Sequence, residues 1–280
     1  MSLDSVTILI NSWLPEPHAG LLAGILFGTR ATMSRDLYEA LVSTGTLHIV
    51  ALSGANISIL SGLVASTLSG FRISRRIAGL LTIIIIIGFV AFVGTSPSVV
   101  RAAIMGCLAM VGVVAGRAVW PFWSWVVTVC CMLAFSPLLA GDVSFQLSAG
   151  ATLGILLFGQ KTEKIPDSDP VKENHNLKSI FRYIRLFIDR DLRLTLSAQV
   201  FTIPVIFFHF HRISLVSPLP NLAIGWILPL LTGLGYLAVL AGVIWSPLGQ
   251  IFAWIVWLPL EYVIRVVEIF AKIPFASIGY

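Results

Sequence analysis

The chain has 280 residues, a formal net charge of +5, 57% hydrophobic residues and only 11% charged residues. An ordinary soluble domain carries roughly 25% charged and about 45–50% apolar residues, so this composition excludes a soluble globule. Uncharged runs of about 18 residues have the length of a membrane-spanning helix. The sequence therefore predicts an all-α polytopic membrane protein.

The first apolar stretch, residues 5–28, is interrupted by the polar and proline-containing sequence PEPH at residues 15–18. Proline interrupts a helix because it lacks a backbone N–H. This pattern predicts a short interfacial helix followed by a short or partial membrane helix. Residues 1–46 are assigned to this amino-terminal part, and residues 47–280 to one transmembrane domain.

Polar residues interrupt the next apolar run, LHIVALSGANISIL at residues 47–60. They are His48, Ser53, Gly54 and Asn56. Lipid offers polar groups no hydrogen-bond partners, so neighbouring helices or a water-filled cavity must satisfy them. A passive anchor has no use for such residues. We therefore expect this stretch to carry function.

About eight transmembrane helices are predicted, and some of them are expected to be discontinuous. The clearest run, residues 77–94, has no charge and as a helix covers about 27 Å of a hydrocarbon core of about 30 Å. The candidate spans are residues 47–69, 77–94, 98–116, 119–140, 143–159, 194–210, 218–244 and 250–271.

Later spans contain four more polar residues of interest. Arg101 lies near the start of its span, where it either snorkels to the interface or supplies a pore charge. Gln146 and Ser148 begin another span on the same side of the membrane, so all three can face one cavity. Asn221 follows two prolines and precedes Pro229. This spacing predicts a broken helix, of the kind that lines protein cavities.

Basic residues gather in the loops on one side of the predicted bundle. Arg72, Arg75 and Arg76 follow the first crossing, and more lie in residues 160–193. The positive-inside rule places both loops in the cytoplasm and the carboxyl terminus outside.

The second of these loops ends in a predicted basic amphipathic helix. Apolar residues recur at helical spacing from Leu177, and Lys178, Arg182 and Arg185 share the opposite side. Such a helix either anchors on anionic lipid headgroups or forms a basic rim that faces a polyphosphate.

Four sequence motifs resemble, in order, the competence domain of the ComEC DNA-uptake proteins. They are HIVALSGANISIL, GTSPSVVRAAIM, GDVSFQLSAGATLGIL and ISLVSPLPNLAIGWILPLL. The resemblance covers nearly the whole chain and implies an inner-membrane channel that passes one strand of transforming DNA into the cytoplasm. Its implied lining is His48, Ser53, Gly54, Asn56, Arg101, Gln146, Ser148 and Asn221. Asn56 stands where the family signature has a second His, which argues against a His pair for a metal or proton relay.

Full-length members of that family commonly add an oligonucleotide-binding domain and a metallo-β-lactamase-like domain, and neither fits in 280 residues. The sequence has no hydrolase metal motif and no nucleotide-binding loop, so we expect no enzyme, metal or cofactor here. The expected partners are single-stranded DNA, membrane lipids, a cytoplasmic ATPase, and separate nuclease or DNA-binding subunits. The membrane potential is the other candidate energy source. An alternative interpretation is that the chain is a fragment of a longer protein.

Two other classes of protein are alternatives. An intramembrane serine protease would pair Ser53 with His48, but residues five apart differ by about 140° around a straight helix. A small-molecule or ion transporter also uses broken helices with polar residues near the membrane midplane. Composition alone favours the transporter, and the family resemblance favours DNA.

Overall fold

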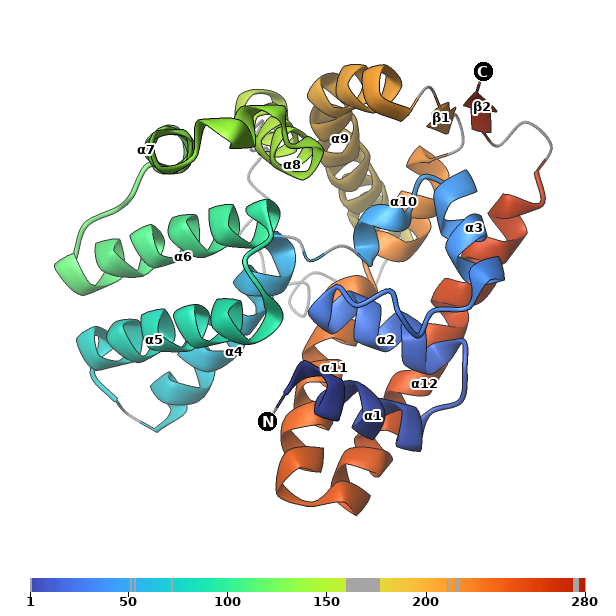
Figure 1. Ribbon diagram of the computed structural model, residues 1–280, viewed down its shortest axis with the longest axis horizontal. Coiled ribbons are helices and arrows are strands. Elements are labelled where there is room, and N and C mark those ends of the chain that lie inside the picture. The colour runs from blue at the N-terminus through green and yellow to red at the C-terminus, as the bar shows by residue number, and fades with distance from the viewer. Residues whose placement is uncertain are drawn as a thin grey trace.

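The computed structural model describes residues 2–50, 52, 54–71, 73–159, 177–210, 212–214, 217–273 and 277–279. Side chains are described throughout these ranges except at 55, 69, 177–188, 190, 191, 210, 212–214 and 277–279. Apart from one pair of three-residue strands, the regular structure of this part of the chain is helical (Figure 1). An all-α polytopic membrane protein is the fold class that the sequence predicts.

Three short helices form the amino-terminal part: α1 (Leu3–Trp13), α2 (His18–Phe27) and α3 (Arg35–Ser43). The prolines at 15 and 17 separate α1 from α2, as predicted. Gly28 ends α2 in the left-handed region, with φ of 72°, which glycine adopts at no steric cost. Helix α3 was not predicted; Ser34 begins it by accepting a hydrogen bond from the Leu37 backbone N–H.

The predicted span over residues 47–69 is only partly helical, which corrects the sequence analysis. The α-helix here, α4, covers Gly54–Gly70, and Leu47–Ile49 form a separate 3-10 turn, η1. Just before this turn, Gly45 has φ of 69°, and the Thr44 and Thr46 hydroxyls hydrogen-bond to each other at 2.8 Å. These residues end α3 and turn the chain ahead of η1.

Helices α5 (Arg75–Val93) and α6 (Pro97–Ala115) form a hairpin that packs against α4. The chain then passes through α7 (Pro121–Phe135) and the turn η2 (Pro137–Gly141). It continues into α8 (Val143–Gly154) and a π-helical turn, η3 (Ile155–Gly159). Figure 1 shows α5, α6 and α7 on the left, and α4 joins them to the right-hand part through contacts with α11 (Leu228–Ile244). The long helix α9 (Leu177–Phe210) packs against α8.

The last third of the chain contains the predicted broken helix. Helices α10 (Pro218–Gly225) and α11 (Leu228–Ile244) meet at an angle of 51°, and α12 (Ser246–Ala271) packs along α11. Strand β1 (Arg212–Ser214) pairs antiparallel with β2 (Ser277–Gly279), with Ile213 opposite Ile278.

Four of the described helices are long and apolar enough to cross a membrane, and the bent α10–α11 pair makes five. Three of the predicted spans, those around α4, α7 and α8, are represented by helical segments of 17 residues or fewer. The predicted count of eight crossings is therefore not established by length and composition.

The larger of two hydrophobic clusters joins α1, α2 and α3 to α10, α11 and α12. Every residue of α2 is buried. At one end of the cluster, the Trp13 ring fills a space where Gly242 and Gly249 let α11 and α12 approach closely. Its indole N–H donates to the Ser246 hydroxyl at 3.3 Å. The smaller cluster lies between α4, α5 and α6.

Candidate functional site

Arg101 is the centre of a buried polar cluster between α6 and α8. Its Nε donates to the Ser148 hydroxyl at 2.9 Å, and its Nη1 donates to the Thr152 hydroxyl at 2.7 Å. Nη1 also lies 3.4 Å from the sulfur of Met105, a weak acceptor. Only 5% of Arg101 is exposed, so its guanidinium group points into the protein rather than snorkelling to an interface.

Local sequence explains how this cluster forms. Pro97 starts α6, which places Arg101 in the second turn of that helix. Ser148 and Thr152 are four residues apart, so they project from one face of α8. The Trp125 indole donates to the Ala149 carbonyl at 3.1 Å and fixes α7 against that helix. The predicted proximity of Arg101 and Ser148 is confirmed, whereas Thr152 was missed although its spacing from Ser148 pointed to it.

The first residue of α4 lies beside the Arg101 guanidinium. A Cβ placed on Gly54 would be 3.6 Å from Nη2, the terminal nitrogen that makes neither of the bonds to Ser148 and Thr152. The amino end of a helix carries a partial positive charge that favours anions. Two positive features of different elements therefore meet at this point.

No acidic side chain in the described part of the chain forms an ion pair with Arg101. Its polar partners are two hydroxyls and a thioether, all neutral. A buried guanidinium remains charged because arginine is not deprotonated in proteins. Such a group is expensive to bury without a counter-charge, so this arrangement suits a receptor for an anion.

Two other predicted lining residues of the stretch 47–60, Asn56 and His48, contact groups other than Arg101. Asn56 is buried, and its amide donates to the Ile25 carbonyl of α2 at 2.7 Å. His48 is exposed in the turn η1, with Nδ1 3.3 Å from the Gly45 carbonyl. Ser53 lies outside the described residues. Whether these three line a conduit stays a prediction.

Gln146 and Asn221 also lie apart from the Arg101 cluster. The Gln146 amide donates to the Ala140 carbonyl at 2.7 Å and so closes the turn η2. The Oδ1 atom of Asn221 is buried without a hydrogen-bond partner, in the first turn of α10. Ser217, one helical turn before Asn221, accepts a hydrogen bond from the Gln199 amide of α9 at 3.0 Å. The broken helix therefore holds a second, separate group of polar side chains.

The predicted basic rim is only partly described. Arg75 and Arg76 are exposed in the first turn of α5, and Arg72 lies outside the described residues. The helix predicted from Leu177 is confirmed, because α9 begins there. On its backbone, Lys178, Arg182 and Arg185 follow at spacings of four and three, which places them on one side of the helix.

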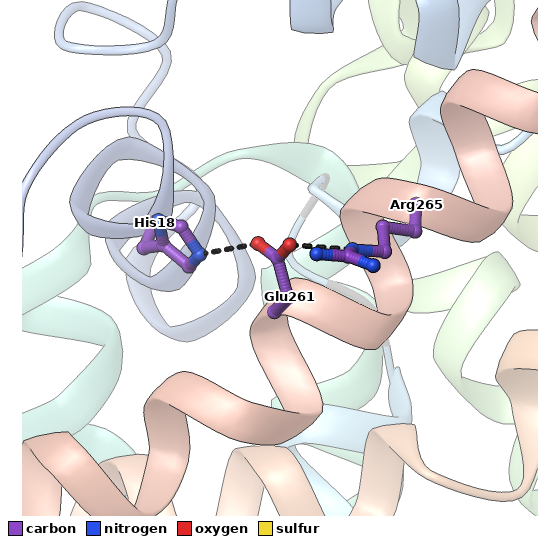
Figure 2. A network of polar contacts seen from close by, with 3 residues as sticks. All are labelled: His18, Glu261 and Arg265. Carbon is purple, nitrogen blue, oxygen red and sulfur yellow. Dashed lines mark hydrogen bonds and ion pairs between the residues drawn. The ribbon is translucent and has the colours of Figure 1, made fainter.

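A second charged cluster, which sequence reasoning missed, joins α2 to α12 (Figure 2). The carboxylate of Glu261 lies between two cationic or protonatable groups. Its Oε2 is 2.9 Å from Nε2 of His18, and its Oε1 accepts from Nε of Arg265 at 2.6 Å. The His18 ring also stacks on Trp257, with centroids 5.2 Å apart and an angle of 23° between the rings.

A sequence signal for this second cluster did exist. Glu261 and Arg265 are ionisable, four residues apart, and lie within the apolar run of α12. Ionisable residues inside a membrane span are candidate functional residues by default. Their partner His18 is 243 residues from Glu261 in sequence, and no local pattern connects the two.

Comparison with known proteins gives a consistent result. The model of the competence protein family matches residues 25–280. ComE operon protein 3 of Bacillus subtilis (strain 168) is 24% identical over 207 residues, which cover 74% of this chain and 24% of that protein. The uncharacterized protein YcaI of Escherichia coli (strain K12) is 28% identical over 243 residues, or 82% of this chain and 29% of that protein. No solved structure matches.

The chain spans about a quarter of the length of the curated relatives that it matches. The family match nevertheless includes α4, α6, α8 and α10, the helices that carry the four motifs. Together with the apolar helices, it identifies a membrane protein that belongs to the competence protein family.

Proposed function

We propose that this chain is the membrane conduit that passes one strand of transforming DNA into the cytoplasm. Family membership supports a part in competence, and the buried, uncompensated charge of Arg101 is the observation that carries the proposal. Single-stranded DNA has about one negative charge per nucleotide, so each phosphate that enters the membrane needs a cation or a dipole to replace water. A passing phosphate would supply the charge that Arg101 lacks.

The geometry around Arg101 suits a contact of this kind. Ser148 and Thr152 occupy Nε and Nη1 and so fix the plane of the guanidinium group. Nη2 then faces the amino end of α4 at Gly54, where a phosphate oxygen would meet both the cation and the helix dipole. Contacts to phosphate carry no sequence information, which a conduit for any DNA requires.

The remaining parts of the uptake machine belong to the same proposal. The chain is placed in the inner membrane, with the 160–193 loop and its basic rim in the cytoplasm and the carboxyl terminus outside. It moves DNA rather than cutting it. A partner ATPase or the membrane potential drives the movement, and separate nuclease and DNA-binding subunits act on either side. Membrane lipids contact the amphipathic part of α9.

The test is uptake of labelled transforming DNA by the native host. A deletion strain is complemented with wild type, Arg101→Gln, Arg101→Lys or the control Arg35→Gln, which removes an exposed arginine paired only with Glu39. Internal DNA is measured as label that resists added nuclease, and membrane levels of each variant are measured by immunoblot. Arg101→Gln is expected to lower internal DNA about tenfold or more, since losing one charged hydrogen bond costs about 1.5–3 kcal/mol. DNA bound at the surface is expected to stay unchanged.

Two results would contradict the proposal. If deletion of the gene does not reduce DNA uptake, the chain is not the DNA conduit. If Arg101→Gln takes up DNA normally, Arg101 has no role in the conduit. Arg101→Lys is expected to be intermediate, because lysine keeps the charge but cannot make the same fixed contacts to both hydroxyls.

The bent pair α10–α11 favours a second candidate, a transporter for ions or small molecules. The 51° break and the unpartnered Oδ1 of Asn221 are features of helices that hold solutes in transporters. If deletion leaves DNA uptake intact, solute flux into proteoliposomes containing the wild type and Asn221→Ala becomes the measurement of choice.

A further inference from the structure

We propose that His18 and Glu261 form a proton-binding site that controls how tightly α2 docks on α12. The docked state is favoured when the imidazole carries a proton, and it weakens when the proton leaves. This inference does not depend on DNA transport or on Arg101, and it concerns the opposite side of the structure (Figure 1).

Burial and position make His18 a sensitive point. It is the first residue of α2, only 7% of it is exposed, and the nine residues that follow it in the helix are also buried. Its bond to Glu261 joins α2 to the middle of α12 (Figure 2). Within the described part of the chain, the other ring nitrogen, Nδ1, is buried and has no hydrogen-bond partner. One bond, from Nε2, therefore provides the polar attachment of this ring.

The strength of that bond depends on the charge of the ring. A hydrogen bond between two ionised groups is roughly twice as strong as one between neutral groups. Imidazole is the side chain whose charge ordinarily changes between about pH 5 and pH 8. Loss of the proton turns an ion pair into a weaker bond from a neutral donor.

Charged groups from two neighbouring segments face His18. Helix α12 presents the carboxylate of Glu261 and the guanidinium of Arg265, and the segment before α2 contributes Glu16. Helix α11 contributes Tyr236, whose hydroxyl donates to the Leu26 carbonyl at the far end of α2. Arg265 opposes protonation, but its side chain is 71% exposed and its charge is therefore screened. The Trp257 ring adds a cation–π contact to a protonated imidazole.

Movement of α2 would also affect helices other than α12. Near its carboxyl end, the Ile25 carbonyl accepts the amide of Asn56, which belongs to the first turn of α4. The same α4 turn begins beside Arg101. Phe27 of α2 also packs edge-on against Phe92 of α5, with ring centroids 5.9 Å apart. Helix α2 thus lies between the proton-binding site and the helices α4 and α5, and a change in its docking reaches both of them.

Hydrogen–deuterium exchange of the full chain in lipid nanodiscs tests this proposal, measured from about pH 5 to about pH 8 and corrected for the intrinsic exchange rate. Peptides from α2 report docking, and the segment 77–93 of α5, which has no ionisable side chain, is the internal reference. In the wild type, protection of α2 is expected to fall about fivefold or more as pH rises through the titration of the imidazole.

His18→Gln is the decisive variant, because its amide can donate to Glu261 at every pH without titrating. It is expected to make the protection of α2 independent of pH. Glu39→Gln, which breaks the exposed pair of Glu39 with Arg35, is the matched control and is expected to behave as wild type. If His18→Gln does not insert into the membrane, Glu261→Gln replaces it and is expected to reduce the pH dependence.

Three results overturn the proposal: protection of wild-type α2 that does not change with pH, protection that rises with pH, or an unaltered pH dependence in the variant used. Because uptake of DNA is not measured here, failure of this experiment leaves the conduit proposal standing. Conversely, failure of the Arg101 experiment leaves the proton-binding site standing.

Discussion

Arg101 and His18 are buried to a similar degree, with 5% and 7% of their surfaces exposed, but their surroundings differ in charge. His18 has a carboxylate at 2.9 Å, and the cation Arg265 shares that carboxylate. Among the described residues, the polar partners of Arg101 are neutral: two hydroxyl oxygens and a sulfur. In this part of the chain the His18 cluster therefore contains an anion and the Arg101 cluster contains none. This difference is the basis for proposing that the His18 contact regulates packing and that the Arg101 contact binds an anionic ligand.

The packing of the two regions differs in the same direction. The His18 cluster adjoins the larger hydrophobic cluster, and 39% of the apolar 18-residue segment of α12 is buried. The Arg101 cluster adjoins the smaller hydrophobic cluster. There the buried share of the same kind of segment is 22% for α5 and 28% for α6. A thinly packed region can separate or admit a ligand at lower cost than a densely packed one. We therefore expect substitutions in the two regions to affect stability and uptake differently.

The largest effect on stability is expected from Gly242→Ala in the densely packed region. An added Cβ would collide with the Trp13 ring, which is buried between α11 and α12. The free energy of unfolding is expected to fall by about 3 kcal/mol, at the upper end of overpacking effects. Chemical unfolding in detergent micelles, followed by tryptophan fluorescence, provides the measurement.

Gly88→Ala on α5 is the matched control for that substitution. Nothing lies within 4 Å of a Cβ built at Gly88, and alanine in a helix is favoured over glycine by about 1 kcal/mol. This variant is expected to be as stable as the wild type or slightly more stable. Equal losses for Gly242→Ala and Gly88→Ala would show that the two regions are packed equally well.

The sequence predicts features that local chemistry determines. The proline break between α1 and α2 and the bend before α11 follow from residue type and spacing. The proximity of Arg101 to Ser148 follows instead from their positions on the same side of the membrane in the predicted alternation of spans. Two features needed long-range information. The partner of Asn56 is a backbone carbonyl, which every residue possesses, so no sequence pattern marks Ile25. His18 and Glu261 meet only because α2 and α12 pack together.

The boundary of α4 shows the limit of hydropathy as a signal. Leu47 to Leu60 is apolar enough to suggest one helix, but Leu47–Ile49 form the 3-10 turn η1 and α4 begins at Gly54. Hydropathy averages over such a change, because it records polarity rather than backbone conformation. The predicted boundary therefore preceded the observed start at Gly54.

The second-largest effect on stability is expected when the hydroxyl acceptors of the Arg101 cluster are removed. Ser148→Ala combined with Thr152→Val removes both hydroxyl acceptors and leaves the guanidinium buried with unpaired donors. The free energy of unfolding is expected to fall by about 2 kcal/mol. In the Arg101→Leu background the same pair of substitutions is expected to cost much less, since no charge then needs those hydroxyls.

A double-mutant cycle measured by chemical unfolding gives this coupling directly. Arg101→Leu alone is expected to leave stability unchanged or to raise it, because a buried charge without a counter-ion is replaced by an apolar group. A large loss of stability in Arg101→Leu would mean that the arginine is structural, and the contrast between the two clusters would then disappear.

The smallest of these effects is expected from Asn56→Ala, at the joint between the two regions. The substitution deletes the hydrogen bond to the Ile25 carbonyl and leaves that buried acceptor unpaired, which costs about 1 kcal/mol. Asn221→Ala is the control, because the Oδ1 of Asn221 is buried without a partner and its removal relieves an unsatisfied atom. We expect Asn56→Ala to be less stable than Asn221→Ala when both are measured by chemical unfolding.

DNA uptake by the same two variants then separates structure from function at Asn56. If uptake by Asn56→Ala falls only in proportion to the amount of protein in the membrane, the asparagine serves to hold α4 against α2. If uptake falls much further than the amount of protein, Asn56 also contributes to the conduit, as the resemblance implies. A buried amide that is engaged with a backbone carbonyl is poorly placed to contact a moving strand, so we expect the first result.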